Sequence, residues 1–155
     1  MTQKTSYIGP KIALYQPDIP QNTAAIIRTC SCLGVKLEII QPCGFFLSDP
    51  RFKRVVMDYM DISSIKFYQS YEDFEAAKTK GRVILATTKA KEVYTNFRFR
   101  GDDTLLFGRE SSGVPESLHK KIKYKIKIPM IKNKRSLNLA TSAAIIISES
   151  LRQIV

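Results

Sequence analysis

The sequence predicts an α/β protein with a mostly parallel sheet flanked by helices. Its strand-like runs are short, apolar and rich in β-branched residues, at residues 11–15, 37–40, 82–87 and 104–107. Segments with helical spacing lie between these runs, and such alternation is typical of parallel sheets. Two runs, ending at Phe107 and Ile128, lead into loops of small and polar residues. Open α/β sheets place ligands at strand ends of this kind.

The first strand, at residues 11–15, is stopped by Pro17 and Pro20. A helix is predicted from Asn22 to Leu33, with Gly34 ending it. A second short strand follows at residues 37–40.

Two further helices are predicted before the middle of the chain. Residues 50–59 form a helix with a basic face of Arg51, Lys53 and Arg54. Residues 70–73 resemble a capping box and open a helix that runs to Lys80. The apolar run at 82–87 then predicts another buried strand.

The second half continues with a strand at 104–107 and a short helix at 115–120. Residues 121–128 alternate strictly between lysines and apolar residues, which predicts a strand with one buried face. From about residue 138 onward, apolar residues share one helical stripe and predict a C-terminal helix.

Composition predicts a single domain, residues 1–155, large enough to fold without disulfides or metals. The 25 Lys and Arg residues outnumber the 14 Asp and Glu residues, which gives a net charge of +11. Such an excess favours a polyanionic partner, chiefly nucleic acid. The N-terminus lacks a secretory h-region, and an odd number of cysteines (Cys30, Cys32 and Cys43) fits a reduced, cytoplasmic setting. We expect no membrane association.

Several common sites are excluded. Residues 108–113 have the glycine spacing of a P-loop, but Val114 and Pro115 stand where its lysine and hydroxyl residue belong. No dinucleotide-binding glycine fingerprint follows the first strand. His119, the only histidine, sits among lysines and is expected to be exposed, so a Ser-His-Asp triad is not predicted. The cysteines lack zinc-ligand spacing and are expected to pack as small apolar residues, so we predict no metal.

Three segments carry a resemblance to a known family: residues 12–28, residues 105–115, and residues 128–130 with 135–139. In this order they are similar to the three motifs of the SPOUT superfamily of RNA 2′-O-methyltransferases. The chain most resembles the small TrmL-type enzymes, which methylate the ribose of the wobble nucleotide of tRNA. Asp58-Tyr59 and residues 86–89 are also similar to these enzymes.

The resemblance implies a SPOUT fold with a deep C-terminal trefoil knot, a homodimer, and methylation of C34 or U34 in the anticodon stem-loop of tRNA. It also implies S-adenosylmethionine as cofactor, held in the knot largely by main-chain groups. Carried over by position, the cofactor-binding residues are Ala86, Thr87, Thr88, Gly108, Ile128, Ser136, Leu137 and Leu139.

The same resemblance implies five catalytic residues. Arg28 is expected to clamp the phosphate next to the target hydroxyl, since a guanidinium is a poor base, or else to form a structural ion pair. Asn22 shapes the site or only caps its helix. Glu110 orders the site through a hydrogen bond or ion pair, or is an exposed loop carboxylate. Ser136 and Asn138 bond the ribose or the cofactor, although Asn138 could instead simply start the last helix.

Basic residues are expected to flank this site and contact RNA phosphates: Lys53, Arg54, Lys89, Lys91, Lys132 and Lys134. The chain departs from the wobble enzymes at Arg109, where they usually carry proline, and at Ser111-Ser112, where they usually carry Thr-Arg. Two alternative functions stay open: 2′-O-methylation of another RNA (ribosomal RNA or another tRNA position), and RNA binding without catalysis.

Overall fold

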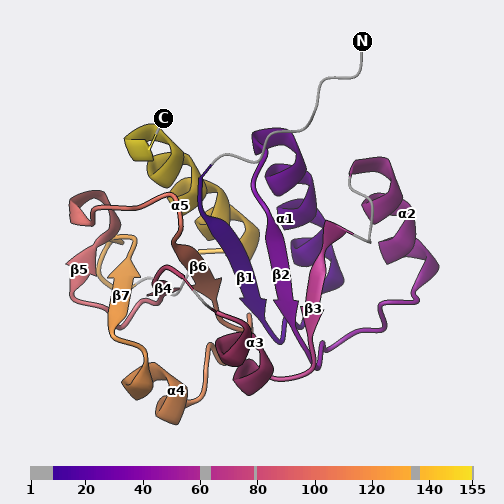
Figure 1. Ribbon diagram of the computed structural model, residues 1–155, viewed down its shortest axis with the longest axis horizontal. Coiled ribbons are helices and arrows are strands. Elements are labelled where there is room, and N and C mark those ends of the chain that lie inside the picture. The colour runs from indigo at the N-terminus through magenta and orange to yellow at the C-terminus, as the bar shows by residue number, and fades with distance from the viewer. Residues whose placement is uncertain (1–8, 60–63, 79, 134–136, 155) are drawn as a thin grey trace.

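The centre of the fold is a seven-stranded, wholly parallel sheet (Figure 1). The computed structural model describes residues 9–59, 64–78, 80–133 and 137–154. The strand order is β3-β2-β1-β6-β4-β7-β5. The strands are β1 (Lys11–Tyr15), β2 (Leu37–Ile40), β3 (Lys66–Tyr68), β4 (Val83–Ala86), β5 (Glu92–Val93), β6 (Thr104–Phe107) and β7 (Tyr124–Lys127).

Helices cover both faces of the sheet, so the molecule has three layers (Figure 1). Because side chains alternate along a strand, β1 sends Ile12 and Leu14 to one face and Ala13 and Tyr15 to the other. The first face packs against α1 (Pro20–Leu33), α2 (Pro50–Tyr59) and α5 (Leu139–Ile154). The second packs against α3 (Tyr71–Ala77) and α4 (Glu116–Lys121). Strands buried on both faces explain the near-continuous apolar runs in the sequence.

The predicted α/β class with a mostly parallel sheet is confirmed, and several elements have the predicted bounds. Strands 11–15, 37–40 and 104–107 and helix 50–59 agree with the structure residue for residue. Gly34 ends α1 in the left-handed region, with φ of 68°. The bounds of these elements are therefore set by the local sequence, because each run is bounded by a proline, a glycine or a polar turn.

Several predicted elements have different bounds. The first helix begins at Pro20, so Asn22 lies inside its first turn and the N-cap residue is Ile19; a capping role for Asn22 was therefore wrong. The helix opened by Ser70 ends at Ala77, although Ser70 does cap it by accepting a hydrogen bond from the Asp73 amide at 3.1 Å. The strand predicted over 82–87 spans only Val83–Ala86, and the short helix predicted over 115–120 begins and ends one residue later.

The alternating segment 121–128 forms a strand only over residues 124–127. Lys121 completes α4, and Ile122 is buried against the α3–α4 side of the sheet as the C-cap of that helix. Packing at the end of a helix overrides the local alternation there. The structure also adds β3 and β5, which the sequence pattern did not reveal.

Candidate functional site

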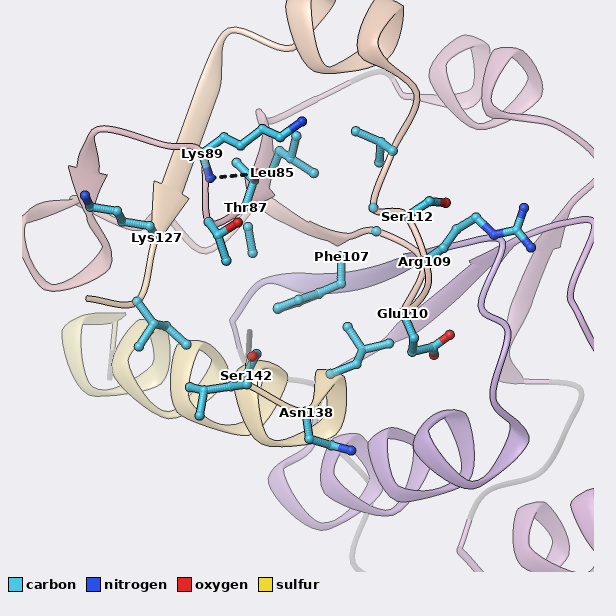
Figure 2. A pocket seen from close by; sticks show the side chains of 18 of the residues that line it. Leu85, Thr87, Lys89, Phe107, Arg109, Glu110, Ser112, Lys127, Asn138 and Ser142 are labelled. Atoms are coloured by element: carbon cyan, nitrogen blue, oxygen red, sulfur yellow. Dashed lines mark hydrogen bonds between the residues drawn. The ribbon is translucent and has the colours of Figure 1, made fainter. Parts of the chain in front are cut away.

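A cavity of about 510 Å³ lies at the carboxyl ends of three adjacent strands, β4, β6 and β7 (Figure 2). Its walls come from the segments that follow these strands and from the first turns of α5. The strands are parallel neighbours, so their ends meet at one edge of the sheet and three loops converge there. Phe107 projects into the middle of the site, and Ser142 borders it from α5 (Figure 2).

The loop after β6 is shaped by two glycines. It folds back on itself through two main-chain hydrogen bonds, from the Arg109 amide to Gly113 at 3.1 Å and from the Gly113 amide to Arg109 at 2.9 Å. A Cβ atom on Gly108 would lie 2.7 Å from the Cα atom of Gly113, and Gly113 itself has φ of +67°. Glycine is therefore required at the first position by close backbone approach and favoured at the second by conformation.

The cavity gathers nearly all of the cofactor-binding residues expected from the family resemblance. The expected residues that line it are Ala86, Thr87, Thr88, Gly108, Ile128, Leu137 and Leu139. Ser136, expected in both the cofactor and the catalytic sets, lies outside the described residues.

Two asparagines join α1 to the start of α5 at the edge of the cavity. The Asn138 Nδ2 atom donates a hydrogen bond to Asn22 Oδ1 at 3.0 Å, and both residues line the cavity. Asn138 Oδ1 also accepts from the Ala140 amide at 2.9 Å and the Thr141 amide at 3.3 Å. Asn138 thus caps the last helix and reaches a second element at once. Its side chain points toward α1 (Figure 2).

Glu110 is held against the start of α1. Its Oε2 atom accepts hydrogen bonds from the Asp18 amide at 2.6 Å and the Ile19 amide at 3.2 Å. Ile19 makes no capping bond of its own, so a carboxylate distant in sequence satisfies main-chain donors at this helix terminus. The other oxygen, Oε1, is buried and has no hydrogen-bond partner among the described residues. Glu110 thus ties the β6 loop to the start of α1 through one of its two carboxylate oxygens.

Asp18 anchors the same junction from the other side. Its carboxylate accepts from Arg109 Nε at 3.1 Å, from the Ser111 amide at 3.1 Å and from Ser111 Oγ at 2.5 Å, and it also contacts Arg109 Nη2. Burial opposes ionisation of Asp18, but the hydrogen bonds from Arg109 and Ser111 outweigh it and hold the pKa of the carboxyl below its usual range. Residues 109–111 and 18–19 thus form a clasp between the β6 loop and α1.

One of the expected RNA-contacting residues lines this cavity, and most of the others are exposed outside its wall. Lys89 lines it, but among the described residues Lys53, Arg54, Lys91 and Lys132 are exposed and not part of its wall. Lys134 lies outside the described residues. That these residues contact RNA beside the site stays a prediction; Lys53 and Arg54 lie on α2, which packs beside α1.

Arg28 is also absent from the described cavity wall. It is exposed on α1, and its guanidinium carbon lies 4.9 Å from the centre of the Tyr59 ring on α2. This contact is a cation–π interaction rather than the ion pair weighed as the alternative role.

His119 was missed by the sequence analysis, which expected it to be exposed. It is half-buried and lines the cavity, with Nε2 3.5 Å from Thr87 Oγ1. Its neighbour Leu118 is buried under the sheet, so the short helix α4 turns His119 toward the strand ends. The signal available in the sequence was its place on the helix that directly follows the β6 loop.

The cysteines differ in how deeply they are buried. Cys30 is buried, and burial raises the pKa of its thiol to about 12, whereas Cys32 is exposed and does not pack as expected. Within the described part of the chain, no three His, Cys, Asp or Glu residues are grouped as metal ligands. None of the helices described is long and apolar enough to cross a membrane.

Comparison with known proteins identifies the family. Residues 10–148 match the SpoU rRNA methylase family. The chain belongs to this family. It is 48% identical over 145 residues to a tRNA (cytidine(34)-2′-O)-methyltransferase of Beijerinckia indica, covering 92% of this chain and 91% of that protein.

Solved structures agree with the family assignment. One, from a study of 2-OH methylation of C/U34 on tRNA, is 38% identical, with a TM-score of 0.88 and coverage of 96% of this chain and 97% of that one. The rRNA methyltransferase of Sinorhizobium meliloti, solved with AdoMet bound, shares the fold. It is 23% identical, with a TM-score of 0.82 over 95% of this chain and 57% of that one.

Proposed function

We propose that this SpoU-family protein is an S-adenosylmethionine-dependent tRNA 2′-O-methyltransferase that acts on the wobble nucleotide, C34 or U34. The observation that carries the proposal is the 48% identity to a tRNA (cytidine(34)-2′-O)-methyltransferase over more than nine tenths of both chains. The net charge of +11 supports a polyanionic substrate. We take residues 1–155 as one methyltransferase domain working in the cytoplasm, and the trefoil knot stays a prediction.

The cavity suits the proposed cofactor. Its volume of about 510 Å³ is within the usual range for small-molecule sites. Its wall at Gly108 is bare backbone, because a side chain there would collide with Gly113. S-adenosylmethionine, when bound, supplies a methyl group on a positively charged sulfur. Ala86, Thr87, Thr88, Gly108, Ile128, Leu137 and Leu139 would hold it, together with Ser136.

The chain's own residues would mainly bind and orient the ribose. Methyl transfer from a sulfonium needs little acid catalysis, because the leaving group departs neutral, so alignment of the 2′-oxygen is the main requirement. Glu110 would order the site, because its Oε2 atom ties the β6 loop to the start of α1. The Asn22–Asn138 pair fixes the position of α5 beside it.

We further propose a homodimer in which Arg28 of one subunit completes the site of its partner. Arg28 is exposed on α1 and is not part of the described wall of its own cavity, which supports a role elsewhere. Lys53 and Arg54, on the neighbouring helix α2, would then bind tRNA beside the partner's cavity. Mixing inactive Arg28→Ala and Asn138→Ala subunits should restore activity, since one site in each mixed dimer is intact. No recovery in verified mixed dimers would rule out this sharing.

The deciding experiment is methyl transfer with labelled S-adenosylmethionine. Purified protein is incubated separately with unmodified tRNA, cellular tRNA and ribosomal RNA, and the products are digested and mapped by mass spectrometry. A 2′-O-methyl group at position 34 is the expected result. Transfer only to another nucleotide or to ribosomal RNA would overturn the wobble assignment, and absence of cofactor binding would favour an RNA-binding factor without catalysis.

A further inference from the structure

A second cavity, of about 300 Å³, lies at the same edge of the sheet, at the ends of β1, β2 and β3. It is bordered by α3 and α4 on the side of the sheet opposite α1 (Figure 1). None of the catalytic or cofactor-binding residues discussed above lines it.

Three glutamines form a row across this second cavity. Gln16, Gln41 and Gln69 each directly follow the last residue of β1, β2 and β3, and all three line the cavity. The main-chain ladder continues through them: the Gln16 amide donates to Ile40 and the Gln41 amide to Tyr68, both at 2.8 Å. Because neighbouring strands lie about 4.8 Å apart and are in register here, the three residues stand side by side at one level. We call these residues the glutamine row.

The glutamine row is chemically available. Within the described part of the chain, the side chains of Gln41 and Gln69 make no hydrogen bonds, and Gln69 is exposed. Each carboxamide carries both a donor group and an acceptor group. Gln and Asn side chains read the edges of nucleobases for this reason, and RNA recognition targets unstacked bases in single-stranded loops.

The charges around the row favour a base over a phosphate. Lys121, a cation lining the cavity, is paired with Glu75 at 2.8 Å. Glu72 also lines the cavity and would repel a phosphate. Tyr71 forms part of the wall, and its pKa is raised to about 12 by burial and by Glu75 and Glu72, so its hydroxyl stays protonated as a donor. A neutral, planar ligand with donors and acceptors on its edge fits this lining.

The two cavities share a wall. Arg109 lines the first cavity, and its Nη1 atom donates to Oε1 of Gln16, which lines the second, at 3.4 Å. A residue of the first cavity wall thus contacts a residue of the second, so the two cavities are neighbours along the edge of the sheet.

We propose that the glutamine row binds one unstacked base of the RNA substrate, adjacent to the nucleotide whose ribose is methylated. The inference rests on the proposed function, since it requires RNA at the first cavity. It assigns to the second cavity the selection of a neighbouring base, by hydrogen bonds from Gln41 and Gln69.

The test is a double-perturbation cycle on tRNA binding. Three tRNAs are compared: intact, and with a single abasic nucleotide on the 5′ or the 3′ side of nucleotide 34. Each is titrated into the wild-type protein and into the Gln41→Ala/Gln69→Ala variant. We expect one abasic site to weaken wild-type binding by about tenfold, and the double variant to weaken intact tRNA similarly. Combining the two changes should then cost no more than twofold beyond either alone.

The proposal is overturned if the abasic site and the double variant lower tRNA affinity independently, so that their losses multiply. It is also overturned if the abasic site weakens binding to the double variant as much as it weakens binding to the wild type. Lys120→Ala, an exposed position on α4 outside the cavity, is the matched control and should keep the full abasic penalty. If the double variant folds poorly, Gln69→Ala alone is used, because Gln69 is exposed. Methylation of nucleotide 34 by wild-type protein, measured in parallel, separates failure of this inference from failure of the proposed function.

Discussion

The two cavities lie at the same edge of one sheet but are built differently. The first is shaped by a loop in which Gly108 and Gly113 allow close main-chain approach. The second is lined by residues that include three glutamines, each directly following its strand. The first should therefore be disrupted by adding atoms and the second by removing polar groups. Their shared contact, Arg109 with Gln16, is where the two should respond together.

The largest effect is expected for Asn138→Ala in the first cavity. The variant loses the bond to Asn22 that positions α5 and should lower kcat by about a hundredfold. tRNA affinity should change less than twofold. The lost helix cap should cost about 1 kcal/mol of folding stability. Single-turnover kinetics and filter binding measure the two quantities; equal losses in both would contradict the assignment, with Thr141→Ala as the control on the same helix.

A tenfold or greater loss of cofactor affinity is expected for Gly108→Ala. The new Cβ atom would lie 2.7 Å from Gly113 and force the β6 loop into the cavity. Gly101→Ala is a matched control, because a Cβ atom there meets nothing within 4 Å. Titration calorimetry with S-adenosylmethionine measures both variants. Similar affinities for the two would show that the backbone approach at Gly108 does not shape the site.

A smaller effect on both cavities is expected for Arg109→Ala. The variant loses the hydrogen bonds to Asp18 and Gln16 across the shared wall, and the partly exposed side chain limits the loss to about threefold. Cofactor and tRNA affinity should both fall, and Arg109→Lys should restore only part of each, since lysine lacks the fork geometry. A loss of affinity for only one of the two ligands would show that Arg109 does not couple the two cavities.

The smallest effect is a pH dependence set by Asp18. Because its pKa is depressed in the folded protein, its stabilising contribution is present above its unfolded value of 3.8 and is lost as the pH falls below that through the folded pKa. The difference in Tm between wild type and Asp18→Asn should be constant from pH 7 to about pH 4.5 and shrink at lower pH. Thermal melts across this range measure it, and a constant difference down to pH 3 would contradict the clasp.

The sequence located the first cavity far better than the second. Glycine and small polar residues after Phe107 and Ile128 mark loops of close backbone approach, and these loops resemble family motifs. The glutamine row leaves no comparable trace, because Gln16, Gln41 and Gln69 are far apart in sequence. Their relation depends on the register between β1, β2 and β3, and β3 was not predicted at all.

The amino-acid sequence by itself determined the fold class and the limits of its main strands, because buried parallel strands are continuous apolar runs ended by local turn residues. It also determined that Gly34 ends α1, through a backbone conformation that favours glycine. Tertiary structure alone decided that Glu110, and not Asn22, accepts the main-chain hydrogen bonds at the start of α1. It also decided that His119 lines the cavity. These outcomes depend on contacts between residues as many as 92 positions apart, which no local pattern encodes.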